Sequence, residues 1–143
     1  MKLKLAVLGI AAAMIAALPI AAHHSFSAEY DSKQITVKGK FTHMDWINPH
    51  SWVHIDVVGA DGKVTSWAGE TPPPNGLFRN GWRKDSLKKG EEIEISGNPA
   101  KDGTAHMWAS SVKLLDRQKD AKGNAPTMGF GSRPPTEGPQ PAK

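Results

Sequence analysis

The chain has 143 residues with no cysteine, and its formal net charge is +4. The lack of cysteine excludes disulfides, thiol catalysis and thiolate metal sites. The excess positive charge lies at the two ends, because residues 23–115 carry eleven basic and eleven acidic side chains, and this balance argues against a nucleic-acid-binding protein.

Residues 1–22 have the layout of a secretory signal peptide. Two lysines near the start are followed by an apolar, alanine-rich run over residues 5–20 and by small residues up to Ala22. The run is about 16 residues long, shorter than the roughly 20 that a membrane-spanning helix needs. We therefore expect cleavage after Ala22 and a periplasmic or secreted mature chain with no membrane span. A retained single-pass anchor is the alternative.

The middle of the chain alternates between apolar and polar residues with a period of two, which is typical of β-strands. Asp-Gly pairs in "GADGK" and "KDGT" predict two tight turns between such segments. Five strands are expected, at residues 35–46, 51–58, 64–70, 91–97 and 105–115. The predicted core consists of Val37, Phe41, Val53, Ile55, Val57, Ile93, Ile95 and Val112.

Residues 72–90 lack the period of two and separate the third predicted strand from the fourth. Prolines suit the start of a helix and Gly81 suits its end, so one or two short helical turns are expected, with their apolar residues packed over the end of the sheet. The segment also holds the one locally basic patch, which we interpret as a solvated face. Its members are Arg79, Arg83, Lys84, Lys88 and Lys89.

Five strands with a helical element between the third and the fourth is the element order of the OB-fold, a small, partly open Greek-key barrel. We therefore predict an all-β fold, a five-stranded OB-fold-like barrel over residues 23–117. Residues 118–143 are dense in Gly, Pro and small polar side chains. Such a composition buries too little apolar surface to offset chain entropy, so this segment is predicted to be a disordered tail.

The outer face of the second and third strands is the usual ligand platform of OB-folds. Here it is expected to present Trp52, His54 and Asp56, with Trp67 beside them. Exposed rings on this face would stack on a planar or sugar-like ligand, whereas buried rings would serve packing alone. A turn at Asn48-Pro49-His50 is expected to join the first two strands.

Several separated motifs resemble an uncharacterised family of small exported bacterial proteins, a domain of unknown function. They are the "AHHSF" junction, "WINPHSWVHIDV" with its NPH-x-W pattern, "PNGLFRNGWRKDSLKKGEEIEISG" and "AKDGT". The resemblance covers roughly residues 21–115 and implies a periplasmic location. It implies no particular reaction, substrate or cofactor.

Cleavage after Ala22 would give His23 a free α-amino group beside its own imidazole. Without thiols, nitrogen ligands of this kind suit Cu(II) or Zn(II). We therefore consider a site for a divalent metal such as copper, formed by His23, His24 and His50. His50 is favoured because its turn is the best placed to reach the N-terminus. The other formal candidates for the third nitrogen are His43, His54 and His106.

Motifs typical of enzymes are missing from the sequence, which has no H-E-x-x-H, no G-x-S-x-G and no phosphate-binding glycine loop. We therefore predict a non-catalytic binding module. Two versions remain open. One binds a divalent metal through histidines. The other binds a periplasmic protein or a small ligand through the aromatic outer face, without metal.

Overall fold

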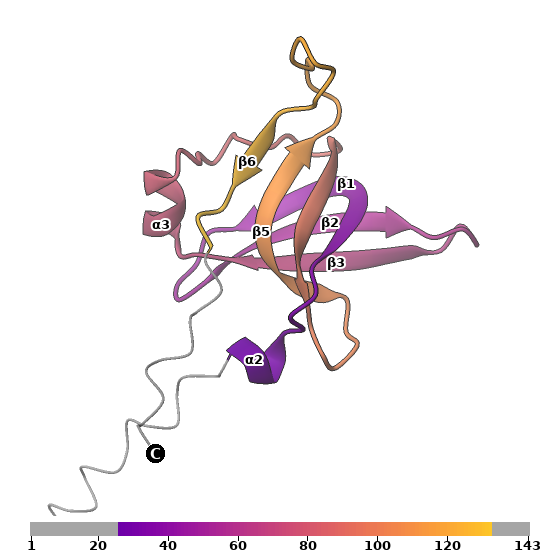
Figure 1. Ribbon diagram of the computed structural model, residues 1–143, viewed down its shortest axis with the longest axis vertical. Coiled ribbons are helices and arrows are strands. Elements are labelled where there is room, and N and C mark those ends of the chain that lie inside the picture. Colours follow the sequence, from indigo (N-terminus) through magenta and orange to yellow (C-terminus); the bar gives the residue numbers. More distant parts are fainter. Residues whose placement is uncertain (1–25, 133–143) are drawn as a thin grey trace, which may run out of the picture.

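The computed structural model describes residues 26–132 (Figure 1). The predictions for the signal peptide, for His23 and His24 and for residues 133–143 lie outside this range. Within residues 26–132, no helix is both long enough and apolar enough to cross a membrane.

Strands dominate the described part of the chain, and the helices in it are short. The elements are α2 (Phe26–Glu29), β1 (Ile35–Asp45), β2 (Ser51–Val58), β3 (Val64–Thr71), α3 (Pro74–Arg79), β4 (Glu92–Pro99), β5 (His106–Leu114) and β6 (Thr127–Gly129). The five predicted strands are confirmed as β1 to β5, with ends that differ by a few residues. The predicted helical turn is α3, which lies between the third and fourth strands as expected.

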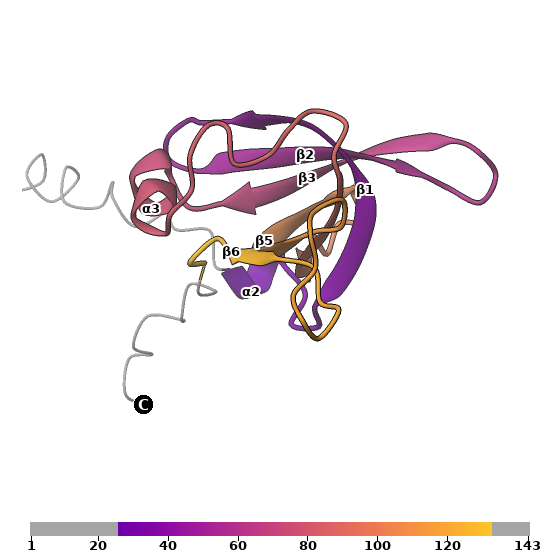
Figure 2. The same ribbon diagram turned by 90° about the horizontal axis from the view of Figure 1, so that it is seen from above.

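Strands β1 to β5 close into a barrel, from which β2 and β3 extend as a two-stranded ribbon (Figures 1 and 2). Antiparallel pairings connect them in the order β3-β2-β1-β4-β5, and a parallel pairing of β3 with β5 joins the two ends. This parallel seam consists of three residue pairs, Ala68–His106, Gly69–Met107 and Glu70–Trp108. The predicted small all-β barrel is therefore confirmed.

The barrel interior is filled by the predicted core. Six of the eight predicted residues are buried, and Val37 and Val57 are half-buried against the same cluster. The six are Phe41, Val53, Ile55, Ile93, Ile95 and Val112. Side chains alternate between the two faces of a strand, so His54 and Asp56 point away from this core. The predicted register of β2 is correct.

The close approach of β4 to β5 depends on Gly97. The register of this pair shifts between Ser96 and Gly97, and a Cβ atom on Gly97 would lie 2.2 Å from the carbonyl oxygen of Trp108. A side chain of any size would therefore push the two backbones apart. The shift marks a β-bulge, a feature that bends a strand locally.

The segment that contains α3 covers one end of the barrel. Leu77 and Trp82 are fully buried in the core, as predicted for the apolar residues of this segment. Gly81 follows the helix with a φ of 85°, a left-handed conformation that favours glycine at helix ends. Phe78 is exposed and stacks on Trp46, with ring centroids 5.1 Å apart.

The prediction of a disordered tail over residues 118–143 is wrong for the part around β6. This strand pairs with β5, and Phe130 behind it is fully buried. The Phe130 ring stacks on Trp82 with centroids 4.5 Å apart, and Trp82 Nε1 donates a hydrogen bond of 2.8 Å to the Gly129 carbonyl. Composition averages over a segment. It therefore misses one aromatic side chain that docks on an existing apolar surface.

Candidate functional site

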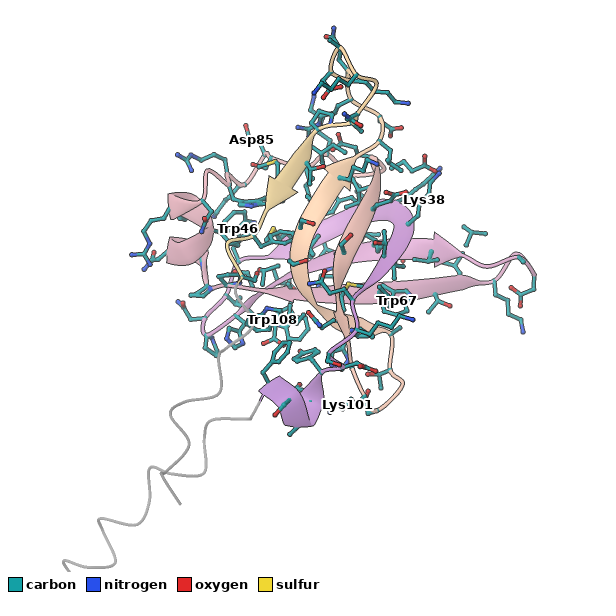
Figure 3. All side chains as sticks on the ribbon, viewed as in Figure 1. Lys38, Trp46, Trp67, Asp85, Lys101 and Trp108 are labelled. Atoms are coloured by element: carbon teal, nitrogen blue, oxygen red, sulfur yellow. The ribbon has the colours of Figure 1, made fainter. Side chains whose placement is uncertain are left out.

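A group of aromatic and ionisable side chains gathers at the end of the barrel next to α2. We call it the barrel-end cluster and define it by five residues, Tyr30, His50, Glu70, His106 and Trp108. The parallel seam brings Glu70 beside Trp108, and Tyr30 directly follows α2. Figure 3 shows Trp108 near α2. His50 belongs to the predicted connection between β1 and β2, in which the Asn48–Pro49 peptide bond is cis.

The carboxylate of Glu70 is the centre of this cluster. Its side chain is only 9% exposed, and each of its oxygens has a partner. The Tyr30 hydroxyl donates to Oε2, and His50 Nδ1 contacts Oε1. A carboxylate accepts hydrogen bonds, so a neutral His50 carries its proton on Nδ1. Its Nε2 atom then has a free lone pair, on a side chain that is 41% exposed.

Tyr30 works as a permanent donor to Glu70. Burial, the hydrogen bond to Glu70 and the negative charge of that carboxylate together raise the pKa of the Tyr30 hydroxyl far above its ordinary value. The hydroxyl therefore keeps its proton at neutral pH. Because it donates that proton to Glu70, it holds the carboxylate in the orientation that faces His50.

Aromatic rings enclose the cluster. The Trp108 ring meets the rings of Phe26 and His50 edge to face, with centroids 6.0 and 5.4 Å away, and the Tyr30 and His106 centroids are 5.8 Å apart. Trp108 is buried, and its Nε1 atom has no hydrogen-bond partner within residues 26–132. A buried donor without a partner costs about 1–3 kcal/mol. The cluster therefore offers an unused donor as well as the free lone pair of His50.

The described chain begins at this cluster. Phe26 packs against Tyr30 and Trp108, with ring centroids 5.4 and 6.0 Å away. The predicted metal site also includes His23 and His24, which precede Phe26 in the sequence. Their participation in a site with His50 stays a prediction, because both lie outside the described residues.

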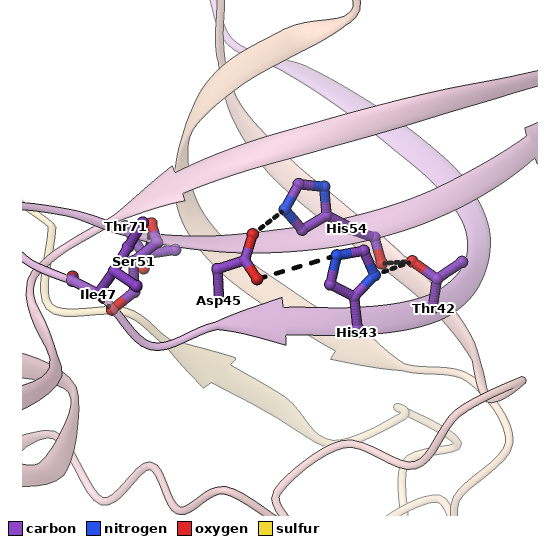
Figure 4. A network of polar contacts seen from close by, with 7 residues as sticks. All are labelled: Thr42, His43, Asp45, Ile47, Ser51, His54 and Thr71. Atoms are coloured by element: carbon purple, nitrogen blue, oxygen red, sulfur yellow. Dashed lines mark hydrogen bonds and ion pairs between the residues drawn. The ribbon is translucent and has the colours of Figure 1, made fainter.

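A second histidine cluster lies on the outer face of β1 and β2 (Figure 4). We call it the outer-face triad and define it as His43, Asp45 and His54. The two imidazole rings stack with centroids 4.3 Å apart. Asp45 Oδ2 lies 3.0 Å from His54 Nε2, and Asp45 Oδ1 lies 4.0 Å from His43 Nε2. One candidate ligand atom from each residue lies within 4.8 Å of the other two.

The strand register places only part of the predicted ligand face on the outer side of the barrel. Trp67 pairs with Ile55 and packs against the core, so its placement beside the outward-facing residues is wrong. Ala68 takes the position opposite His54 instead. Trp52 does lie on the outer face, half-buried, with its ring centroid 6.3 Å from that of His106.

Sequence reasoning identified His50 but missed the residues that hold it. No local pattern marks Tyr30, Glu70 or Trp108, because α2 and the parallel seam bring them together from distant parts of the chain. Asp45 was also missed, although a signal for it exists. The spacing H-x-D places His43 and Asp45 on the same face of a strand.

Comparison with known proteins places the chain in a sequence family but gives no activity. Residues 11–109 match the model of a family described as a family of unknown function, DUF6152. None of the curated proteins matches the chain. The solved structure of apo TiaS, a tRNAIle2 agmatidine synthetase, is similar with a TM-score of 0.41 and 17% identity. The match covers 65% of this chain and 22% of that one, and a likeness this weak indicates nothing about function.

Proposed function

Because the chain belongs to the DUF6152 family, whose function is unknown, we propose its function from the barrel-end cluster: an exported, non-catalytic module that binds a divalent metal such as copper. The contact between His50 Nδ1 and the buried Glu70 carboxylate carries this proposal. Histidines that ligate metals almost always donate their second ring N–H to a carboxylate, a carbonyl or water, which orients the ring and raises its basicity. His50 has this arrangement, with Nε2 left as the ligand atom.

The remaining ligands in this proposal come from the start of the mature chain. Cleavage after Ala22 gives His23 an α-amine and an imidazole that chelate one ion together, and His50 Nε2 completes a set of three nitrogens. The neighbouring His24 is an alternative source of the third nitrogen. Three nitrogens without thiolate suit Cu(II) or Zn(II), and Cu(II) is bound most tightly of the divalent first-row ions. Periplasmic location is part of the proposal and rests on the layout of residues 1–22.

In the proposal, Glu70 and Tyr30 support the ligand His50 and do not bind the ion themselves. Both oxygens of Glu70 are engaged by Tyr30 and His50, and the raised pKa of Tyr30 keeps that hydroxyl protonated. The Glu70 side chain is only 9% exposed, so in the proposal it orients His50 and leaves Nε2 of that imidazole as the ligand atom.

Calorimetric titration with Cu(II) tests the proposal on processed protein that starts at His23. All samples carry His43→Gln and His54→Gln, so the outer-face triad cannot contribute. We expect one tight site, which is lost in His50→Gln and after one alanine is added ahead of His23. His106→Gln is the matched control and is expected to keep the site, because this imidazole is hydrogen-bonded to the Thr104 hydroxyl, whereas Glu70 is engaged by Tyr30 and His50.

Two outcomes would contradict the proposal. Equal binding with and without the added alanine would exclude the terminal amine as a ligand. Absence of Cu(II) binding in every sample would exclude the metal site and favour a module that binds a partner or small ligand through the outer face around Trp52.

A further inference from the structure

We propose that the outer-face triad is a second divalent-metal site, separate from the barrel-end cluster. It uses two imidazole nitrogens and one carboxylate, from His43, His54 and Asp45. The inference does not depend on the proposed function, because it involves other residues and needs neither cleavage nor a free N-terminus.

A β-bulge assembles this set of ligands. Phe41 pairs with Ile55, but the next pair is His43 with His54, so Thr42 is an extra residue in β1. In an uninterrupted ladder Thr42 would stand opposite His54. The bulge instead puts the two histidines opposite each other, and Asp45, two residues further along β1, projects from the same face. Bulges commonly re-aim side chains beside functional sites.

Thr42 also sets the tautomer of His43. Its hydroxyl donates to the backbone carbonyl of His54 at 3.1 Å, so its oxygen is left to accept from His43 Nδ1, also at 3.1 Å. His43 therefore carries its proton on Nδ1, and its Nε2 has a free lone pair directed to the side of Asp45 (Figure 4). This is the form of histidine that binds metals, with the second nitrogen held by a hydrogen-bond partner.

Metal binding at the triad displaces a proton that lies between His54 and Asp45. His54 Nε2 lies 3.0 Å from Asp45 Oδ2, and because a carboxylate accepts, the proton between them belongs to Nε2. A divalent ion replaces this proton, and a neutral His54 then carries its proton on Nδ1. The ion also balances the negative charge of Asp45, whose ion-pair partners within residues 26–132 are the two histidines and no lysine or arginine.

Metal binding requires one ring to turn. The two imidazoles are within 6° of parallel, and each ligand nitrogen must point its lone pair at the ion within the plane of its own ring. Parallel rings that stack on each other share no such point. His43 is the ring that can move, because its side chain is 60% exposed compared with 25% for His54. Loss of the ring stack is therefore a specific signature of binding at this site.

Two imidazoles and a carboxylate match the chemistry of Zn(II) with water at the fourth position, and of first-row ions that use a two-histidine, one-carboxylate face. The site opens to solvent, so water fills the remaining positions. Zn(II) is the appropriate probe, since it has no redox chemistry and permits NMR of the imidazoles.

The test is a Zn(II) titration of processed protein that carries His50→Gln, which removes the proposed ligand of the barrel-end cluster. We expect saturation at one ion per chain by calorimetry, and imidazole NMR signals of His43 and His54 that shift together as the ring stack is lost. His43→Gln and His54→Gln should each lower the affinity at least tenfold, and Asp45→Asn should lower it as well. His106→Gln is the matched control and should bind as before.

The NMR titration remains informative even if a triad variant fails to fold, because it is recorded on protein in which His43, Asp45 and His54 are unchanged. Binding that does not saturate, affinity that is unchanged in His43→Gln and His54→Gln, or shifts confined to His106 would each overturn the inference. Failure of Cu(II) binding at the barrel-end cluster, with Zn(II) binding retained at the triad, would refute the proposed function alone.

Discussion

Truncation of Phe130 to alanine is expected to destabilise the protein by about 3–5 kcal/mol, the usual range for a buried phenylalanine. The ring has no solvent exposure and stacks at 4.5 Å on Trp82, which is also fully buried. Its removal leaves a cavity beside a rigid indole that is held by the hydrogen bond to the Gly129 carbonyl. A domain of this size has a total stability of about 5–15 kcal/mol, so the loss would be a large fraction of it.

Urea unfolding followed by tryptophan fluorescence measures this effect, with stability compared at an unchanged dependence on urea. Lys119→Ala is the matched control, since this exposed residue lies in the same C-terminal segment and should change stability by no more than about 0.5 kcal/mol. A cost below about 1 kcal/mol for Phe130→Ala would show that the segment does not dock on the barrel, and the disordered tail would again be the better description.

Three further predictions concern the cluster and the barrel. Glu70→Gln should weaken Cu(II) binding by about 10–100-fold in calorimetry, as expected for a residue that orients a ligand, and unchanged affinity would contradict its role. Tyr30 is the only tyrosine, so absorbance at alkaline pH follows it alone. Folding raises the pKa of Tyr30, so no tyrosinate should form in the folded protein near pH 10, where an unperturbed tyrosine titrates. The unfolded chain does release this proton near pH 10. The contribution of Tyr30 to stability is therefore present below about pH 10 and should decline as the pH rises above it. A folded protein that titrates near 10 would refute this. Gly97→Ala should be more destabilising in urea than Gly129→Ala, because the first Cβ would lie 2.2 Å from the Trp108 carbonyl oxygen and the second would come no closer than 4.0 Å to its nearest neighbours. Equal costs would contradict the close approach of β4 and β5.

Local sequence patterns were sufficient to predict most of the barrel. Alternation of apolar and polar residues located β1 to β5, and Gly81 marked the end of α3 correctly. It was harder to predict which side chains of residues 64–71 face the core, since the polar residues at the start of this segment do not distinguish the two faces of the strand. Only the pairing of Trp67 with Ile55 decides that Trp67 points inward, and this pairing depends on a partner strand rather than on the segment itself.

The candidate site was less predictable than the fold for the same physical reason. His50 follows a proline in a short connection, so its position could be inferred from the chain around it. Its support comes from Glu70 and Tyr30, which are 40 positions apart in sequence. Contacts of this kind exist only once the strands are arranged in space. The H-x-D spacing of His43 and Asp45 shows the opposite case, a local signal that predicts half of a site but not the bulge that completes it.

The parallel seam couples closure of the barrel to assembly of the barrel-end cluster. Glu70 and Trp108 face each other across the seam, so a chain with an open barrel lacks the cluster. An ion that binds only the closed form stabilises closure by RT ln(1 + [L]/Kd), about 2.7 kcal/mol at a free concentration 100 times Kd. If the proposed function holds, occupancy of the site and closure of the barrel at this end are thermodynamically linked.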